Sequence, residues 1–361
     1  GLSEKSAPAD LLEYAKLCIT LSQYDEGIEY LNKVKETYMK NRAIQEEAKL
    51  KVNLGEYDEA IKLYEIMLKG NNKDKNIAYI GIGVAYRIKG EFSEAINWLD
   101  KALNGNQLDQ IMAKIELAKV YEDLNDFAIA KKLLEEVIEI SKGKYGRLEY
   151  AKLLIKNHNN EQATKILLNI INEDSNIIDK HEAIMILAIT EKAIGNLQEA
   201  KNYLKQILDK NNKIYYKALC IEIECNIELR EFNLAEENIK ILSYSQSKID
   251  KEKTIFYEAE LLRTQGKTEE SERKYLQLLN NDSCNILALN GLANLYKDIQ
   301  DLRFFDITNK IRSLSGNNEN MASYLEGTYY ISSGRLKKAL ETLKNNINVI
   351  DKNSLLNVNE Y

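Results

Sequence analysis

The chain has 361 residues, of which 29% are charged and 44% hydrophobic, and its formal net charge is −6. Proline occurs once, at Pro8, which predicts a chain that is helical almost throughout, because proline breaks helices. Acidic and basic residues alternate without forming a basic stripe, so we do not expect nucleic acid among the partners.

A tetrapeptide of the form Glu-x-Ala-Lys returns along the chain. It stands at 13–16 (EYAK), 46–49 (EEAK), 116–119 (ELAK) and 149–152 (EYAK), so its starts lie 33, 70 and 33 residues apart. About twelve residues after each alanine, just past a short turn, comes a second small residue. We therefore predict pairs of helices that cross where both side chains are small. The small residues of the first helices are Ala15, Ala48, Gly83, Ala118, Ala151, Ala188, Ala259 and Gly327, and those of the second helices are Gly27, Ala60, Ala95, Ala130, Ala163, Ala200, Ala235, Ser271 and Ala339.

These units resemble the tetratricopeptide repeat family, most closely in AYIGIGVAYRIKGEFSEAINWLDKAL at 78–103. The places of the family's pattern are taken there by Tyr79, Ile82, Gly83, Tyr86, Ala95, Leu99 and Ala102. The resemblance implies an all-α fold, an α-α superhelix (solenoid) of antiparallel helix pairs. About ten repeats form one array over 8–353, with a short tail at 354–361, and the units start near residues 8, 41, 76, 111, 144, 181, 216, 252, 286 and 320.

The connectors between units depart from the family, which often has proline there. The chain instead has NNKDKN at 71–76, NEDSN at 172–176, NNDSCN at 280–285 and SGNN at 315–318. Because Asn, Asp and Ser favour such positions, we expect these runs to end one helix in a left-handed conformation and to cap the next helix.

The resemblance also implies that first helices line a concave inner face. The lysine of each tetrapeptide would then project into a groove, with the glutamate of the same tetrapeptide near its base. From the sixth unit on, the corresponding position carries no lysine. Two interpretations stay open: a groove that accepts an acidic peptide, or a solvated helix face on which each lysine pairs with its own glutamate. The lysines concerned are Lys16, Lys49, Lys119 and Lys152.

Five further residues are candidates for the concave groove. Asn290 and Asn294 lie one turn apart and would hydrogen-bond a peptide backbone, whereas Tyr145, Phe256 and Tyr324 would anchor a partner by burying aromatic area. The carboxylate clamp of the chaperone-binding family members is not expected, because the repeat after Asn294 has Thr328 and no third repeat supplies the basic pair.

No catalytic, metal or cofactor site is expected. His158 and His181 have no Cys, Ser or carboxylate at a recognisable spacing, and the four cysteines form no CxxC motif. The cysteines favour a reducing, cytoplasmic location, and no apolar run is long enough to span a membrane. The chain starts at Gly1, however, so a removed signal or anchor stays open.

The sequence thus predicts a non-catalytic scaffold whose concave groove binds a protein or peptide, possibly acidic, in assembling or regulating a multiprotein complex. Two alternatives are a peptide-responsive regulatory sensor and the substrate-recognition arm of a larger enzyme, such as a glycosyltransferase. Because the end of a solenoid exposes an apolar flank, self-association through an uncapped terminus is a further possibility.

Overall fold

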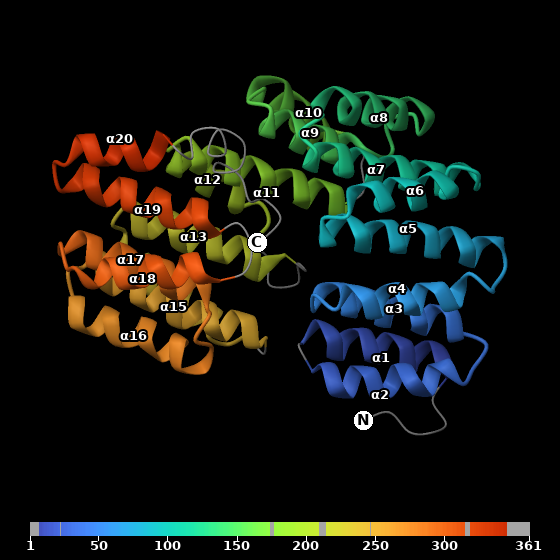
Figure 1. Cartoon of the computed structure of the whole chain (residues 1–361), viewed down its shortest axis with the longest axis horizontal. Coiled ribbons are helices and arrows are strands. Elements are labelled where there is room, and N and C mark those ends of the chain that lie inside the picture. The colour runs from blue at the N-terminus through green and yellow to red at the C-terminus, as the bar shows by residue number, and fades with distance from the viewer. Residues whose placement is uncertain are drawn as a thin grey trace. The chain divides into compact units, whose positions relative to one another are not determined.

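The computed structural model describes residues 7–21, 23–173, 177–208, 214–245, 247–314 and 318–344, and within these ranges it contains twenty helices and no strand (Figure 1). The chain divides into two compact units, Gly1–Ser175 and Asn176–Tyr361. Each unit holds five helix pairs, in which a first helix is followed by a second helix that packs against it.

The first unit contains helices α1 to α10. Their bounds are α1 Pro8–Thr20, α2 Tyr24–Lys35, α3 Lys40–Asn53, α4 Tyr57–Met67, α5 Asn72–Lys89, α6 Phe92–Ala102, α7 Gln107–Asp123, α8 Phe127–Ile140, α9 Arg147–Lys156 and α10 Asn160–Asn172. The first helices α1, α3, α5 and α7 also contact one another in sequence, so they form one continuous face of the stack. Arg87 of α5 strengthens this stacking, because its Nη1 atom lies 2.8 Å from Oδ2 of Asp123 in α7.

The second unit contains helices α11 to α20. Their bounds are α11 Ile177–Ala193, α12 Leu197–Leu204, α13 Tyr215–Glu228, α14 Phe232–Leu242, α15 Lys248–Thr264, α16 Thr268–Asn281, α17 Ile286–Asp298, α18 Arg303–Ser313, α19 Asn318–Ser332 and α20 Leu336–Lys344. The first helices again contact one another from α11 to α19. Glu224 of α13 joins three of them: it lies 2.5 Å from Lys192 Nζ of α11 and accepts a 2.7 Å hydrogen bond from Tyr257 of α15.

The small residues lie at the helix crossings, as predicted. A Cβ atom added to Gly83 in α5 would stand 2.5 Å from Cγ of Leu99 and 3.3 Å from the carbonyl oxygen of Ala95, both in α6. In the eighth repeat the Ser271 hydroxyl donates a 2.9 Å hydrogen bond to the carbonyl of Ala259 across the same crossing. Only small side chains let two helices approach this closely. At the crossing of α5 and α6, Leu99 beside Gly83 is fully buried.

Most of the left-handed residues lie in the turns inside the helix pairs; Lys142, Gly143 and Gly146, in the connector between α8 and α9, are the other described ones. One residue with positive φ stands at each described turn between a first and a second helix: Gly55, Gly90, Asn125, His158, Gly195, Arg230, Gly266, Gln300 and Gly334. Glycine adopts this conformation without strain, which explains its use at five of these turns.

The connectors between pairs cap the following helix, which confirms part of the prediction. The side chains of Asn71, Asn106 and Asn285 accept hydrogen bonds from backbone N–H groups in the first turns of α5, α7 and α17. The other part is wrong: no described residue of 71–76, 172–173 or 280–285 has a positive φ. Extended N-caps, rather than left-handed residues, make these connections.

The observed first helices begin within four residues of the ten predicted unit starts. The continuity of a single array over 8–353 stays a prediction, because the chain divides into two units at Ser175 and Asn176. Residues 174–176, 315–317 and 345–361, including the tail at 354–361, lie outside the described residues.

Candidate functional site

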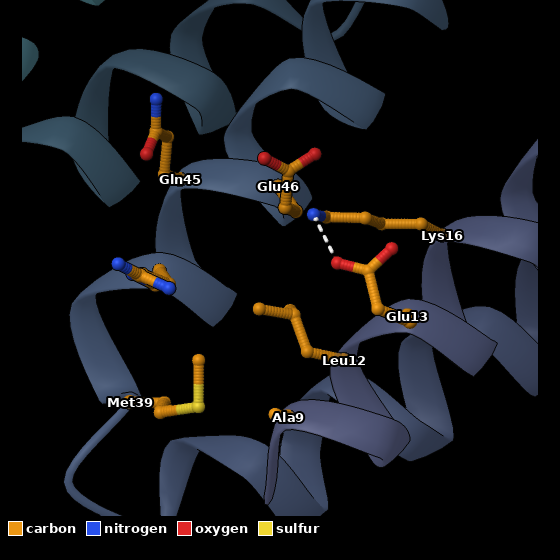
Figure 2. A pocket seen from close by; sticks show the side chains of 8 residues that line it. Ala9, Leu12, Glu13, Lys16, Met39, Gln45 and Glu46 are labelled. Atoms are coloured by element: carbon orange, nitrogen blue, oxygen red, sulfur yellow. Dashed lines mark hydrogen bonds and ion pairs between the residues drawn. The ribbon is translucent and has the colours of Figure 1, made fainter.

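A cavity of about 270 Å³ lies on the first-helix face, between α1 and α3 (Figure 2). Side chains at spacings of three and four residues share one helix face, and this spacing brings two sets of residues to the cavity. It is lined by Ala9, Leu12, Glu13 and Lys16 of α1, by Met39 at the N-cap of α3, and by Arg42, Gln45 and Glu46 of α3. One predicted groove residue, Lys16, is therefore part of an actual hollow.

Two apolar side chains lie at the base of the cavity, and both are almost fully buried. Leu12 is 3% exposed and Met39 is 8% exposed, and both belong to the hydrophobic core of the first repeat. Figure 2 shows their side chains pointing from α1 and from the start of α3 toward the same space. Because both side chains are already buried in the core, they leave little apolar area for a ligand.

Two ion pairs lie at the rim of the cavity. Lys16 Nζ is 2.8 Å from Glu13 Oε1, and Lys49 Nζ, just outside the lining, is 2.9 Å from Glu46 Oε1. Each pair joins residues three positions apart on one helix, as the tetrapeptide predicts. These four charges largely neutralise one another.

Arg42 supplies the positive charge that remains. Within the described part of the chain, neither the Arg42 guanidinium nor the Gln45 amide makes a hydrogen bond or ion pair. Arg42 is exposed, so its guanidinium stays in contact with solvent. The cavity therefore has a solvated guanidinium at its edge.

The remaining lysines follow the same pattern farther along the stack. Lys119 Nζ lies 2.7 Å from Glu116 Oε1 in α7, and the other oxygen of Glu116 is 4.0 Å from Arg87 Nε. Lys152 is half-buried in α9. The structure places all four lysines on first helices, but only Lys16 lines the cavity.

The predicted aromatic anchors fall in three different settings. Tyr145 lies in the loop before α9, where its N–H donates to Ser141 Oγ at 3.1 Å, and its role as an anchor stays a prediction. Phe256 is half-buried in α15, with its ring centroid 5.4 Å from that of Tyr257. It packs against the core instead of standing free. Tyr324 is 50% exposed on α19 and stays a candidate anchor.

The two asparagines lie on α17 and are half-buried. Asn294 Oδ1 accepts a 3.0 Å hydrogen bond from Lys297 Nζ, whereas no hydrogen bond of the Asn290 side chain occurs among the described residues. Their role in holding a peptide backbone stays a prediction.

Sequence reasoning missed Leu12, Met39, Arg42 and Gln45. A signal was available for Arg42, because its only acidic neighbour at helical spacing, Glu46, is also within reach of Lys49. In the structure Glu46 pairs with Lys49, which leaves Arg42 without a carboxylate.

The described residues contain no group of three His, Cys, Asp or Glu side chains placed to hold a metal ion. No helix in the same part of the chain has both the length and the apolar character needed to cross a membrane. On α20, the last described helix, Leu336 is 66% and Leu340 53% exposed. Self-association through this flank stays a prediction.

Comparison with known proteins identifies the repeats. Residues 46–109 and 111–158 each match a tetratricopeptide repeat family model. A tetratricopeptide repeat protein from Parabacteroides merdae is similar in structure, with 17% identity, a TM-score of 0.51, and coverage of 68% of this chain and 93% of that one.

Human IFIT1, solved as a dimer with PPP-AAAA, has 17% identity and a TM-score of 0.51 over 93% of this chain and 81% of its own. A monomeric IFIT1 mutant with Gppp-AAAA has 16% identity and a TM-score of 0.52, covering 93% of this chain and 80% of that one. No curated protein sequence matches the chain. Residues 46–109 and 111–158 are therefore tetratricopeptide repeats, and the twenty described helices, in tandem pairs with small residues at their crossings, have the fold of a tetratricopeptide repeat solenoid.

Proposed function

We propose that the first-helix face of the first unit binds a peptide segment of a protein partner. The chain then acts as a non-catalytic scaffold in the assembly or regulation of a multiprotein complex. Tetratricopeptide repeats indicate a protein-interaction scaffold. The single observation that carries the finer proposal is the cavity between α1 and α3, which lies on the face formed by successive first helices.

The ion-paired lysines are compatible with an acidic ligand. Lys49 is 51% exposed and Lys16 is 38% exposed, and an exposed pair of this kind contributes only about 0–1 kcal/mol. Exchanging the helix's own glutamate for a ligand carboxylate therefore costs little. The lysines would add electrostatic attraction along the face without being fixed contacts.

An oligonucleotide is the contrasting ligand, since the IFIT1 structures were solved with PPP-AAAA and with Gppp-AAAA. Two observations on this chain favour a peptide. Its net charge is −6, and the lysines of its repeated tetrapeptides stand beside glutamates.

The test is selection of short random peptides on the immobilised chain, followed by titration of the selected peptides. A variant with Lys16, Lys49, Lys119 and Lys152 all changed to Gln is measured in parallel, together with a 5′-triphosphate oligoadenylate. We expect saturable binding of acidic peptides that weakens in the variant. Absence of any selected peptide, or binding of the oligonucleotide alone, would overturn the proposal. Selected peptides that bind both forms equally would show that the lysines take no part and would remove them from the site.

A further inference from the structure

The series of lysines on the first helices is interrupted at the third repeat. Val84 of α5 stands 35 residues after Lys49 of α3 and 35 residues before Lys119 of α7, so it takes the place of a lysine. The glutamate that accompanies each lysine is replaced as well, by Gly81. A Cβ atom on Gly81 would overlap the ring of Tyr64 in α4. Packing therefore explains the glycine, whereas the valine turns a charged position of the face into an apolar one.

Two equivalent hydrogen bonds hold α3, α5 and α7 in the same register. Asn41 Nδ2 of α3 donates a 2.8 Å hydrogen bond to Asp74 Oδ2 of α5. The same bond recurs 35 residues later, from Asn76 Nδ2 of α5 to Asp109 Oδ2 of α7, again at 2.8 Å. Because neighbouring helices are joined at equivalent atoms, equivalent residues of the three helices lie in one row. The two lysines and the valine between them form such a row across the first-helix face.

Apolar side chains continue from Val84 along α5. Four of them follow one another at spacings of three and four residues and so share one face of the helix: Ile77, Ile80, Val84 and Ile88. Ile88 is 43% exposed, and Ile80 and Val84 are partly exposed. The middle helix of the row therefore offers apolar area to a ligand, between two helices that offer ammonium groups.

The flanking lysines can accept a ligand carboxylate beside the glutamates that they already contact. An ammonium group has three donors, and Lys49 and Lys119 each use one, at 2.9 and 2.7 Å, for the glutamate of the same tetrapeptide. Their side chains are 51% and 37% exposed, so the other donors are within reach of a ligand. Each lysine and its glutamate balance in charge, and a ligand carboxylate is therefore held by hydrogen bonds rather than by a net positive field.

The dimensions of the row determine the spacing of a matching ligand. Packed helices lie about 8–10 Å apart. A chain in the polyproline II conformation has three residues per turn and rises about 3.1 Å per residue, so every third side chain points the same way after about 9 Å. A peptide in this conformation that crosses α3, α5 and α7 therefore places every third side chain over a new helix.

We propose that the row of Lys49, Val84 and Lys119 selects a peptide in which an apolar residue stands three positions after one acidic residue and three positions before another. Val84 and its apolar neighbours on α5 receive the central side chain, and the lysines receive the two carboxylates. This inference rests on the proposed function, because it states which peptides the first-helix face selects.

The test follows isoleucine-methyl NMR signals, with the resonances of Ile80 and Ile88 assigned through Ile80→Val and Ile88→Val. The probe is the acetylated and amidated peptide Glu-Gly-Ser-Leu-Gly-Ser-Glu. Four further probes replace its leucine with serine, replace its leucine with glutamate, replace both glutamates with glutamine, or move both glutamates next to the leucine. Titrations are repeated on Val84→Lys, which completes the lysine series, and on Val84→Thr, which keeps the side-chain shape. Ile66→Lys is the matched control, at an exposed position of the second helix α4.

We expect the leucine probe to shift the Ile88 signal saturably. The serine probe should bind roughly fivefold more weakly, as for half the burial of a leucine side chain. Loss or displacement of both carboxylates should weaken binding about two- to fivefold. Val84→Thr should reduce the preference for leucine over serine. Val84→Lys should reverse the preference between the leucine and glutamate probes, and Ile66→Lys should change neither.

Equal binding of the leucine and serine probes would overturn the inference, as would unchanged preferences in both Val84→Lys and Val84→Thr. Equal binding of the glutamine probe would exclude the lysines from the selection. Saturable shifts confined to isoleucines outside α5 would overturn the inference and leave the proposed function standing. If selected peptides bind but none of these probes does, the inference alone fails. If neither binds, the proposed function fails as well.

Discussion

Gly83→Ala tests whether the close crossing of α5 and α6 determines the geometry of a repeat. The added methyl carbon would lie 2.5 Å from Cγ and 2.8 Å from Cδ2 of Leu99, a side chain that is fully buried. Alanine in a helix interior is favoured over glycine by about 1 kcal/mol. Overpacking a filled core costs about 1–3 kcal/mol. We therefore expect a net loss of about 1 kcal/mol.

The effect of Gly83→Ala on stability should change from a loss to a gain when the Leu99 side chain is shortened. In a Leu99→Ala background, which itself costs about 2–5 kcal/mol, the new methyl group no longer meets Leu99 and the gain in helix propensity remains. Gly83→Ala should then stabilise by about 1 kcal/mol, which gives a coupling energy of about 2 kcal/mol. Gly90→Ala is the matched control: a Cβ there meets nothing within 4 Å, and its φ of +87° makes the change unfavourable in both backgrounds.

The assay is urea denaturation followed by tryptophan fluorescence. Trp98 is the only tryptophan of the chain and lies in α6, so it reports on this repeat. Its surroundings include Tyr79, at 6.0 Å between ring centroids, and Lys101 Nζ at 3.4 Å from its ring. A stabilising effect of Gly83→Ala in both backgrounds would refute the argument that this crossing has no room for a methyl group.

Three further predictions concern the second unit, each checked by circular dichroism during urea or thermal denaturation. Asn226 is fully buried, and neither of its side-chain polar atoms has a partner in the described structure. Asn226→Leu should therefore raise the free energy of unfolding by about 1–3 kcal/mol, and a loss of stability would contradict this. Burial raises the pKa of Glu222, to which Asn238 donates a 3.1 Å hydrogen bond. Because the folded-state pKa is raised, the protonated carboxyl contributes stability below the unfolded value of 4.5, and this stability is lost as the pH rises through the folded-state pKa. Glu222→Gln should therefore stabilise the protein more at pH 7 than below pH 4.5. The opposite trend would exclude burial as the cause. Arg230 has a φ of +59°, so Arg230→Gly should stabilise by about 0.5–1 kcal/mol, as strain relief exceeds the entropic cost of glycine; a decrease in melting temperature would contradict it.

The repeat architecture was predictable because its requirements are local. A crossing of two helices needs a small residue at a fixed distance along the chain, and Gly83 with Ala95, or Ala259 with Ser271, meets that need in the sequence itself. The starts of the first helices could be predicted from the same spacing of small residues. The loop position of Tyr145 was less predictable, because extra turn residues enter there: Gly143 and Gly146 have positive φ, and α9 begins only at Arg147.

The cavity depends on choices between neighbours that spacing cannot decide. Glu46 lies within helical reach of both Arg42 and Lys49, and the structure pairs it with Lys49. The opposite wall of the cavity comes from α1, where Leu12 lies 30 residues before Arg42 in the chain. A periodic pattern identifies the face on which these residues lie, but only their packed arrangement shows that Leu12, Met39 and Arg42 enclose a space.

The most direct measurement of the central claim is photo-crosslinking with a peptide selected on the immobilised chain, one of its residues replaced by a diazirine-bearing analogue. Crosslinked sites are then mapped by mass spectrometry on the native chain and on the variant with Lys16, Lys49, Lys119 and Lys152 changed to Gln. The account predicts crosslinks concentrated on the first helices α1, α3, α5 and α7, and fewer of them in the variant. Crosslinks confined to the second unit, or spread evenly over first and second helices, would contradict it.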